Sequence, residues 1–170
     1  MKHYSAPWGA SLIVISSLVT VLCIGVTLGI AWRNLHPFPW WGILPLVVIA
    51  GAALFTIRGY TITANVILVH RLLWTTHLPL TDLQSAQFEP EAMRRSMRTF
   101  GNGGLFSFTG SFRNKRLGAY RAFVTDPRRT VVLRYPARVV VLSPTAPEEF
   151  VRDLIRLRSL IQALDHDVFT

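Results

Sequence analysis

The chain has 170 residues, a formal net charge of +9 at pH 7 and a pI near 11.0, and 51% of its residues are hydrophobic. Its single cysteine excludes an internal disulfide framework and a multi-cysteine metal site. Arg33 is the only charged residue between Tyr4 and Ile57, whereas residues 58–170 carry all 9 acids and 16 of the 18 Lys and Arg. The first third therefore suits lipid, and the remainder suits water beside an anionic membrane surface.

Two uncharged stretches, residues 10–32 and 38–57, each have the length of a membrane-spanning helix, because a hydrocarbon core of about 30 Å needs about 20 helical residues. The connector, residues 33–37, is so short that the two helices must run antiparallel. We therefore predict a two-helix transmembrane hairpin over residues 1–57. Cleavage of the first helix as a signal peptide is the alternative, but its apolar run exceeds the usual signal core of about 7–15 residues.

The predicted hairpin places both termini in one compartment. Lys2, Arg58 and Arg71 flank it on that side, against Arg33 alone in the connector, so the charge bias predicts a multi-pass cell-membrane protein with cytoplasmic termini. Neither predicted span contains Asp, Glu, Lys or Arg. The pair is therefore predicted to anchor the chain rather than to transport ions.

The region from residue 60 to residue 142 contains short β-branched runs separated by turn signals such as Asn102-Gly103 and Asp126-Pro127. Several short strands at this spacing predict a sandwich or barrel. The period then changes, and apolar residues recur at helical spacing: Phe150, Leu154, Leu157, Ile161 and Leu164. With a capping box from Thr145 to Glu148, this predicts an amphipathic helix at about 146–164.

Several short motifs in this region resemble the bacterial PH (pleckstrin homology)-domain family of small membrane proteins. In chain order they are Gly59-Tyr60-Thr61-Ile62, Pro79-Leu80-Thr81-Asp82-Leu83, the segments 100–106 and 110–118, and Val141-Leu142-Ser143-Pro144 followed by Pro147-Glu148-Glu149-Phe150. The resemblance implies an α+β PH-like domain over residues 58–170, after the hairpin. Its expected form is an antiparallel, partly open barrel of about seven strands, capped by one C-terminal helix, and such domains are generally binding modules.

Two basic clusters and a glycine loop are the candidate ligand site. The loop can expose backbone N–H groups to an anion, because glycine accepts positive φ angles, although Asn-Gly more often marks an ordinary turn. The clusters can bind an anionic lipid headgroup or simply form a solvated basic rim. The candidate residues are Arg94, Arg95, Arg98, Gly101, Asn102, Gly103, Gly104, Arg113, Lys115 and Arg116.

Candidates for catalysis are few: His70, His77, Asp82 and His166 have neither metal-ligand spacing nor a nucleophile motif beside them. We therefore predict no catalytic residue, no metal and no cofactor. The positive charge lacks the zinc spacing or recognition-helix pattern of a nucleic-acid-binding protein, so nucleic acid is not a predicted partner.

The predicted function is a membrane-anchored, non-catalytic PH-like module that presents a protein-interaction or self-association surface at the cytoplasmic face of the membrane. Its predicted partners are membrane lipids and an unidentified membrane or cytoplasmic protein, with a homo-oligomer as one form of the latter. The alternative is a receptor for anionic lipid headgroups through the Arg-rich clusters, and an enzyme of unknown type is third.

Overall fold

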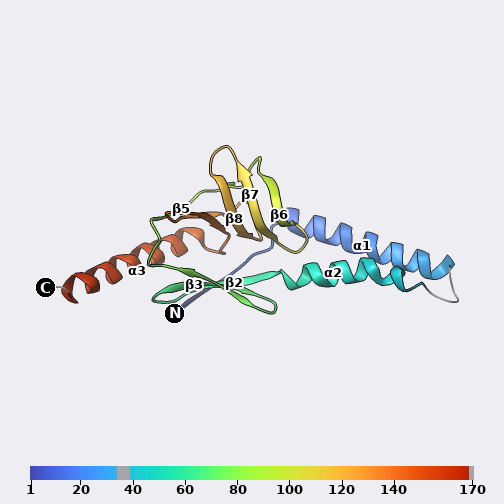
Figure 1. Cartoon of the computed structure of the whole chain (residues 1–170), viewed down its shortest axis with the longest axis horizontal. Coiled ribbons are helices and arrows are strands. Elements are labelled where there is room, and N and C mark those ends of the chain that lie inside the picture. The colour runs from blue at the N-terminus through green and yellow to red at the C-terminus, as the bar shows by residue number, and fades with distance from the viewer. Residues whose placement is uncertain (34–38, 169–170) are drawn as a thin grey trace.

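The computed structural model describes the backbone of residues 1–33 and 39–168 and the side chains of those up to residue 160. Two β-sheets form the centre of the molecule, a pair of apolar helices extends from one end, and a C-terminal helix extends from the other (Figure 1). Residues 34–37 of the predicted connector lie outside the described residues.

Helix α1 (Ala10–Arg33) confirms the first predicted apolar helix and is a candidate membrane span. Among the described residues it is the one helix that is long and apolar enough to cross a membrane, with a mean hydropathy of 2.5. Most of its side chains are exposed, and only Leu12 and Ser16 are buried against the rest of the protein. An exposed apolar helix of this length needs lipid or another protein around it.

The second helical segment is shorter than predicted. Instead of residues 38–57, the helical residues are the 3₁₀ turn η1 (Trp40–Ile43) and helix α2 (Leu44–Leu54). The helix ends early because the chain is already extended at Ile57, where it pairs within a sheet. By length, the prediction of two spanning helices is therefore corrected to one candidate span and a shorter apolar helix that runs beside it.

The first sheet is antiparallel, in the order β1-β2-β3-β4, and contains β1 (Lys2–Ser5), β2 (Ile57–Ile62), β3 (Val66–Arg71) and β4 (Thr75–Pro79). Strand β1 was not predicted, because four residues of mixed polarity carry no clear period. Its pairing with β2, where Tyr4 lies opposite Tyr60, joins the segments immediately before and after the helical pair. The chain therefore enters and leaves that pair at the same place.

The second sheet has the order β5-β9-β10-β8-β7-β6. Its strands are β5 (Ser85–Phe88), β6 (Met97–Gly103), β7 (Phe108–Asn114), β8 (Gly118–Val124), β9 (Val131–Arg134) and β10 (Val139–Leu142). The prediction of about seven antiparallel strands for the domain is corrected here, because its described residues form nine strands, β2 to β10, and β8 and β10 are parallel. Strand β9 pairs on the far side of β10, so β10 returns beside β8 in the same direction.

Helix α3 (Pro147–Val168) covers the core between the two sheets, as predicted, by burying Phe150 and Leu154. The ring of Tyr4 on β1 packs edge-on against Phe150, with centroids 5.1 Å apart. The Thr145 hydroxyl, predicted to cap this helix, donates a hydrogen bond to the Ser5 carbonyl at 2.7 Å. The start of α3 is thus tied to the N-terminal strand.

Candidate functional site

The base of the helical pair is fixed to the second sheet by three hydrogen bonds. Gly9 N–H donates to the Thr125 carbonyl at 3.0 Å, just before α1. The buried Ser16 hydroxyl accepts from Phe106 N–H at 2.9 Å, and the Ser107 hydroxyl donates to the Phe55 carbonyl at 2.9 Å. Since both helices are held at their base, the space between α2 and the sheet has a defined shape.

A cavity of about 480 Å³ lies in that space. The end of α2 supplies one wall with Gly51, Ala52 and Phe55, and β6, β7 and β8 supply the other. Three arginines reach it from three strands: Arg71 from β3, Arg98 from β6 and Arg121 from β8. The volume falls within the range of about 300–1,000 Å³ typical of small-molecule sites.

The strand register explains how Arg121 reaches the cavity. Arg121 lies opposite Ser111, which lies opposite Phe100, so these three side chains share one face of the sheet. Phe123, two residues after Arg121, is on the same face and is fully buried in the core between the sheets. Arg121 therefore extends the core-facing row toward the helical pair.

Arg71 has the equivalent position on β3. Ile67 and Val69 are fully buried in the core, and Arg71 is the next residue on their face. Its guanidinium carbon lies 5.0 Å from the ring centroid of Phe123 and 5.3 Å from that of Trp74. The guanidinium carbon of Arg121 lies 5.4 Å from the same Phe123 ring, so two cations contact one aromatic side chain.

The positive charge of the cavity is not balanced by acids. No carboxylate lies within 4.0 Å of Arg71, Arg98 or Arg121 among the described side chains. Burial, and secondarily the charge of Arg121, lowers the pKa of Arg71. Its Nε is buried and lacks a hydrogen-bond partner within the protein. A buried unpaired donor on a cation favours an anionic acceptor.

Two glycines shape the floor of the cavity. Gly101 on β6 lies opposite Gly110 on β7, with φ angles of +103° and +138°. A Cβ added to Gly110 would lie 2.2 Å from the Phe100 carbonyl oxygen, so only glycine allows the two strands to approach in this way. The floor consequently carries little side-chain bulk beneath the arginines.

The comparison with protein families assigns this fold. A family model described as bacterial PH domain matches residues 58–158, which contain Arg71, Arg98 and Arg121. The chain belongs to the bacterial PH domain family. Searches among curated proteins and among solved structures gave no match.

In this bacterial PH domain the predicted glycine loop is the end of β6 and the start of the turn to β7. The Asn102 side-chain oxygen accepts from Leu105 N–H at 3.0 Å, and Gly104 N–H donates to the Ser107 carbonyl at 3.2 Å. Gly103 lies beneath the Arg98 side chain, whose Nη1 donates to the Gly101 carbonyl at 3.1 Å. Residues 101–103 therefore pair with β7, and Gly104 begins an ordinary turn rather than an anion nest.

The ten predicted ligand residues are not brought together in one place. Arg98, Gly101 and Asn102 line the cavity, whereas Gly103 ends β6 and Gly104 begins the turn. Arg116 pairs with Glu89 at 2.7 Å. Arg95, Arg113 and Lys115 are exposed and do not line the cavity.

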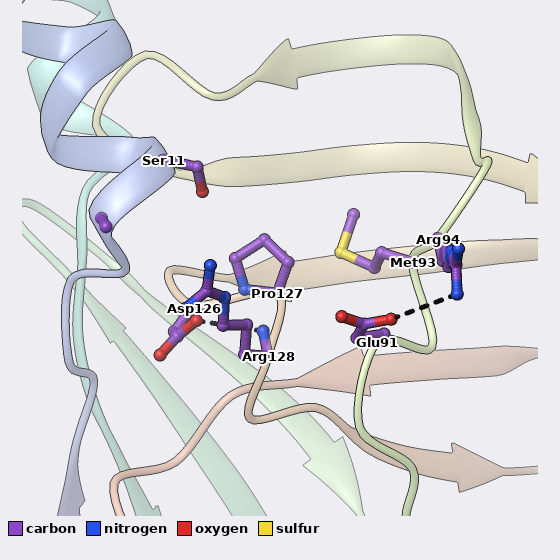
Figure 2. A pocket seen from close by; sticks show the side chains of 8 residues that line it. Ser11, Glu91, Met93, Arg94, Asp126, Pro127 and Arg128 are labelled. Carbon is purple, nitrogen blue, oxygen red and sulfur yellow. Dashed lines mark hydrogen bonds and ion pairs between the residues drawn. The ribbon is translucent and has the colours of Figure 1, made fainter.

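Arg94 lines a different hollow of about 410 Å³, at the start of α1 (Figure 2). Its guanidinium pairs with Glu91 at 3.7 Å. Asp126 and Arg128 lie on the loop between β8 and β9, so acids and arginines both line this hollow. The charges of these side chains offset one another, and the hollow offers no excess charge of either sign.

The catalytic candidates gain no support as a group. The His70 Nε2 lies 2.8 Å from the Thr61 hydroxyl, and His77 and Asp82 are exposed. The side chain of His166 lies outside the described ones. Among the described residues, no three His, Cys, Asp or Glu lie close enough together to hold a metal ion.

Sequence reasoning missed Arg71 and Arg121. The sequence does contain a pattern that indicates Arg71: Ile67 and Val69 alternate along β3, and Arg71 is the next residue on their inward face. A cation at an inward position points to a special environment. For Arg121 the register of β8 was needed, since its segment is apolar on both faces.

Proposed function

We propose that this chain is a membrane-anchored, non-catalytic PH module that holds a binding surface against the cytoplasmic face of the membrane. In this proposal residues 1–57 are the anchor and residues 58–170 form the domain, with β1 shared between them. The observation that carries it is the fixed junction of the two parts: Ser16 and Phe55 of the helical pair are hydrogen-bonded to the loop between β6 and β7. An anchor fixed in this way holds one end of the domain at the bilayer.

The dimensions of the helical pair support insertion of α1 as the candidate span, with the shorter apolar helix returning beside it. Beyond the docked residue Ser16, residues 17–33 of α1 extend over about 25 Å at 1.5 Å per residue, and Trp40–Leu54 returns over a similar distance. This is close to the hydrocarbon thickness of about 30 Å. Trp32 and Trp40 at the far end, each 83% exposed, suit the opposite headgroup layer.

The position of the turn between β2 and β3 argues against lipid binding at that turn. In the lipid-binding eukaryotic domains that the PH-like resemblance brings in, cations cluster around the turn between the first two domain strands. Here that turn, residues 63–65, has no cation and lies at the end of β2 remote from α2. A bilayer around the helical pair would therefore be out of its reach.

Self-association is a second candidate function, because β6 is an edge strand and is exposed along almost all its length. Met97 and Phe100 on it are 76% and 80% exposed. An exposed edge strand can pair with the same strand of a second copy, and confinement to a membrane raises the effective concentration of that copy. Met97→Cys in a Cys23→Ser background should then form cross-linked dimers in membranes, whereas Ala119→Cys on β8 should not.

Cysteine accessibility tests the anchoring proposal. In a Cys23→Ser background, Trp40→Cys at the hairpin end should react with an impermeant thiol reagent on intact cells. Ala119→Cys, on an exposed part of the domain, should react only after the cells are opened. Reaction of Ala119→Cys in intact cells would contradict the cytoplasmic orientation. Protection of Trp40→Cys until the cells are opened would contradict a crossing hairpin.

A further inference from the structure

We propose that the cavity between α2 and strands β6 to β8 binds the phosphate of an anionic membrane lipid, held by Arg71, Arg98 and Arg121. The proposal rests on the membrane anchoring argued above for the source of the ligand. The binding chemistry itself, a phosphate on converging guanidinium groups, is independent of anchoring and can be tested separately.

The charge distribution favours an anion in this place. Arg71 and Arg121 lie on the same Phe123 ring although their charges repel, and no described carboxylate pairs with either. Some arginines elsewhere in the domain do have acids beside them: Arg116 pairs with Glu89, and Arg129 with Asp126. A phosphate between Arg71 and Arg121 would remove the repulsion and accept the unpartnered N–H of Arg71.

The donors available in the cavity match phosphate. Each guanidinium presents a planar fork that can donate two parallel hydrogen bonds to two phosphate oxygens. The Ser111 side chain lies between Phe100 and Arg121 in the cross-strand row and adds a hydroxyl donor. A carboxylate has fewer oxygens to share among the guanidinium groups that line the cavity.

The surroundings favour a lipid over a free phosphate. One wall of the cavity is the last turn of a membrane-anchoring helix, with Gly51, Ala52 and Phe55. Phe100 on the opposite wall is 80% exposed, and Leu73, beside Trp74 in the turn after β3, is 70% exposed. A free phosphate would leave these apolar groups in water, whereas the acyl chains of a lipid bound in the cavity would cover them.

The test uses the full chain in micelles of a neutral maltoside detergent. Binding of a short-chain phosphatidic acid is measured by calorimetry, beside the zwitterionic phosphatidylcholine of the same chain length. One phosphatidic acid per chain is expected, with phosphatidylcholine at least about tenfold weaker. Arg71→Gln with Arg121→Gln should weaken phosphatidic acid binding by about tenfold or more.

A matched control removes more charge elsewhere. Lys115→Gln with Arg128→Gln and Arg138→Gln removes three exposed cations that do not line the cavity, and it should change the affinity by less than about threefold. Equal loss in this control and in the arginine variant would overturn the site and leave only nonspecific charge attraction. Glycerol phosphate or inorganic phosphate that competes as well as the short-chain lipid would overturn the lipid assignment.

A second variant tests the site independently of whether the arginine variant folds. A Cβ at Gly51 would meet no atom within 4 Å, so Gly51→Phe can place a ring in the cavity while all three arginines remain. This variant should also lose phosphatidic acid binding, with an unchanged thermal unfolding midpoint. Retained affinity in a folded Gly51→Phe protein would overturn the proposal. Both variants should fractionate with membranes as the unaltered chain does, so failure of anchoring would be seen separately.

Discussion

The hydroxyl of Ser16 on α1 accepts a hydrogen bond from the backbone N–H of Phe106, which follows 90 residues later in the chain, at 2.9 Å. The same hydroxyl points toward the Gly104 carbonyl at 3.5 Å, and Ser16 is only 3% exposed. A polar contact of this kind within an otherwise apolar helix fixes both the depth and the rotation of the helix against the sheet. The helical pair is therefore fixed to the folded domain.

Replacing that hydroxyl should loosen the junction. Ser16→Ala leaves the Phe106 N–H without its acceptor, and a buried unpaired donor costs about 1–3 kcal/mol. We expect a lower thermal midpoint and faster amide hydrogen exchange at Phe106, both measured in detergent. Ser17→Ala is the matched control, since Ser17 is exposed, and it should behave as the unaltered chain. Equal exchange rates at Phe106 in both variants would show that the contact does not hold the helix.

The floor of the cavity should tolerate no side chain at residue 110. Gly110→Ala combines a positive φ with a clash against the Phe100 carbonyl, so we expect a loss of about 2–4 kcal/mol in the free energy of unfolding. Gly118 also has a positive φ, of +70°, but its Cβ would enter open space. Gly118→Ala should therefore cost about 1 kcal/mol, from backbone strain alone. Equal losses in urea unfolding would show that the close approach of β6 and β7 is unimportant.

The contact between β1 and α3 should be sensitive to acid. Hydrogen bonds from Tyr4 and Lys2 lower the pKa of Asp153 below its ordinary value of 3.8, and Lys2 Nζ lies 2.9 Å from the carboxylate. A lowered pKa in the folded state means that the unfolded chain binds the proton more tightly. The stabilisation is therefore complete above about pH 4 and is lost as the pH falls through the folded pKa.

Urea unfolding at several pH values checks this sign. Asp153→Asn should be less stable than the unaltered chain at neutral pH, and the two should converge below about pH 4. Asp82→Asn, at an exposed residue outside the ion pairs described, is the control and should show no such convergence. A constant difference across the acid range would contradict the proposed role of the carboxylate.

Tyr60 should make the domain sensitive to alkali. Its hydroxyl donates to the Phe123 carbonyl at 2.7 Å and accepts from Ser143 N–H at 3.2 Å, and burial raises its pKa from 10.0 to about 12. Because the unfolded side chain ionises first, stability should fall between about pH 10 and 12. Tyr60→Phe should cost about 1–3 kcal/mol at pH 7 and should lack this alkaline contribution. A pH-independent difference between the two proteins would refute the assignment.

The sequence by itself determined the broad organisation of this protein. Charge is nearly absent from residue 5 to residue 57, so the first apolar helix could be predicted. The β-branched runs and the helical spacing of Phe150 and Leu154 are also local patterns, so the β-rich region and the C-terminal helix could be predicted too. The family could be predicted as well, because its short motifs follow one another in order along residues 58–158. Each of these depends on neighbours in the chain.

The tertiary structure alone decided the parts that depend on distant pairing. Strand β1 forms because Tyr4 pairs with Tyr60, which follows the helical pair in the chain. The second helix ends early because the chain after it enters β2 of the same sheet. The same holds for the candidate site: Arg71, Arg98 and Arg121 come from three strands, and only the packing of two sheets against α2 brings their charges together. Local sequence shows where charges are, but the distances between them follow from strand register and sheet packing, which distant residues determine.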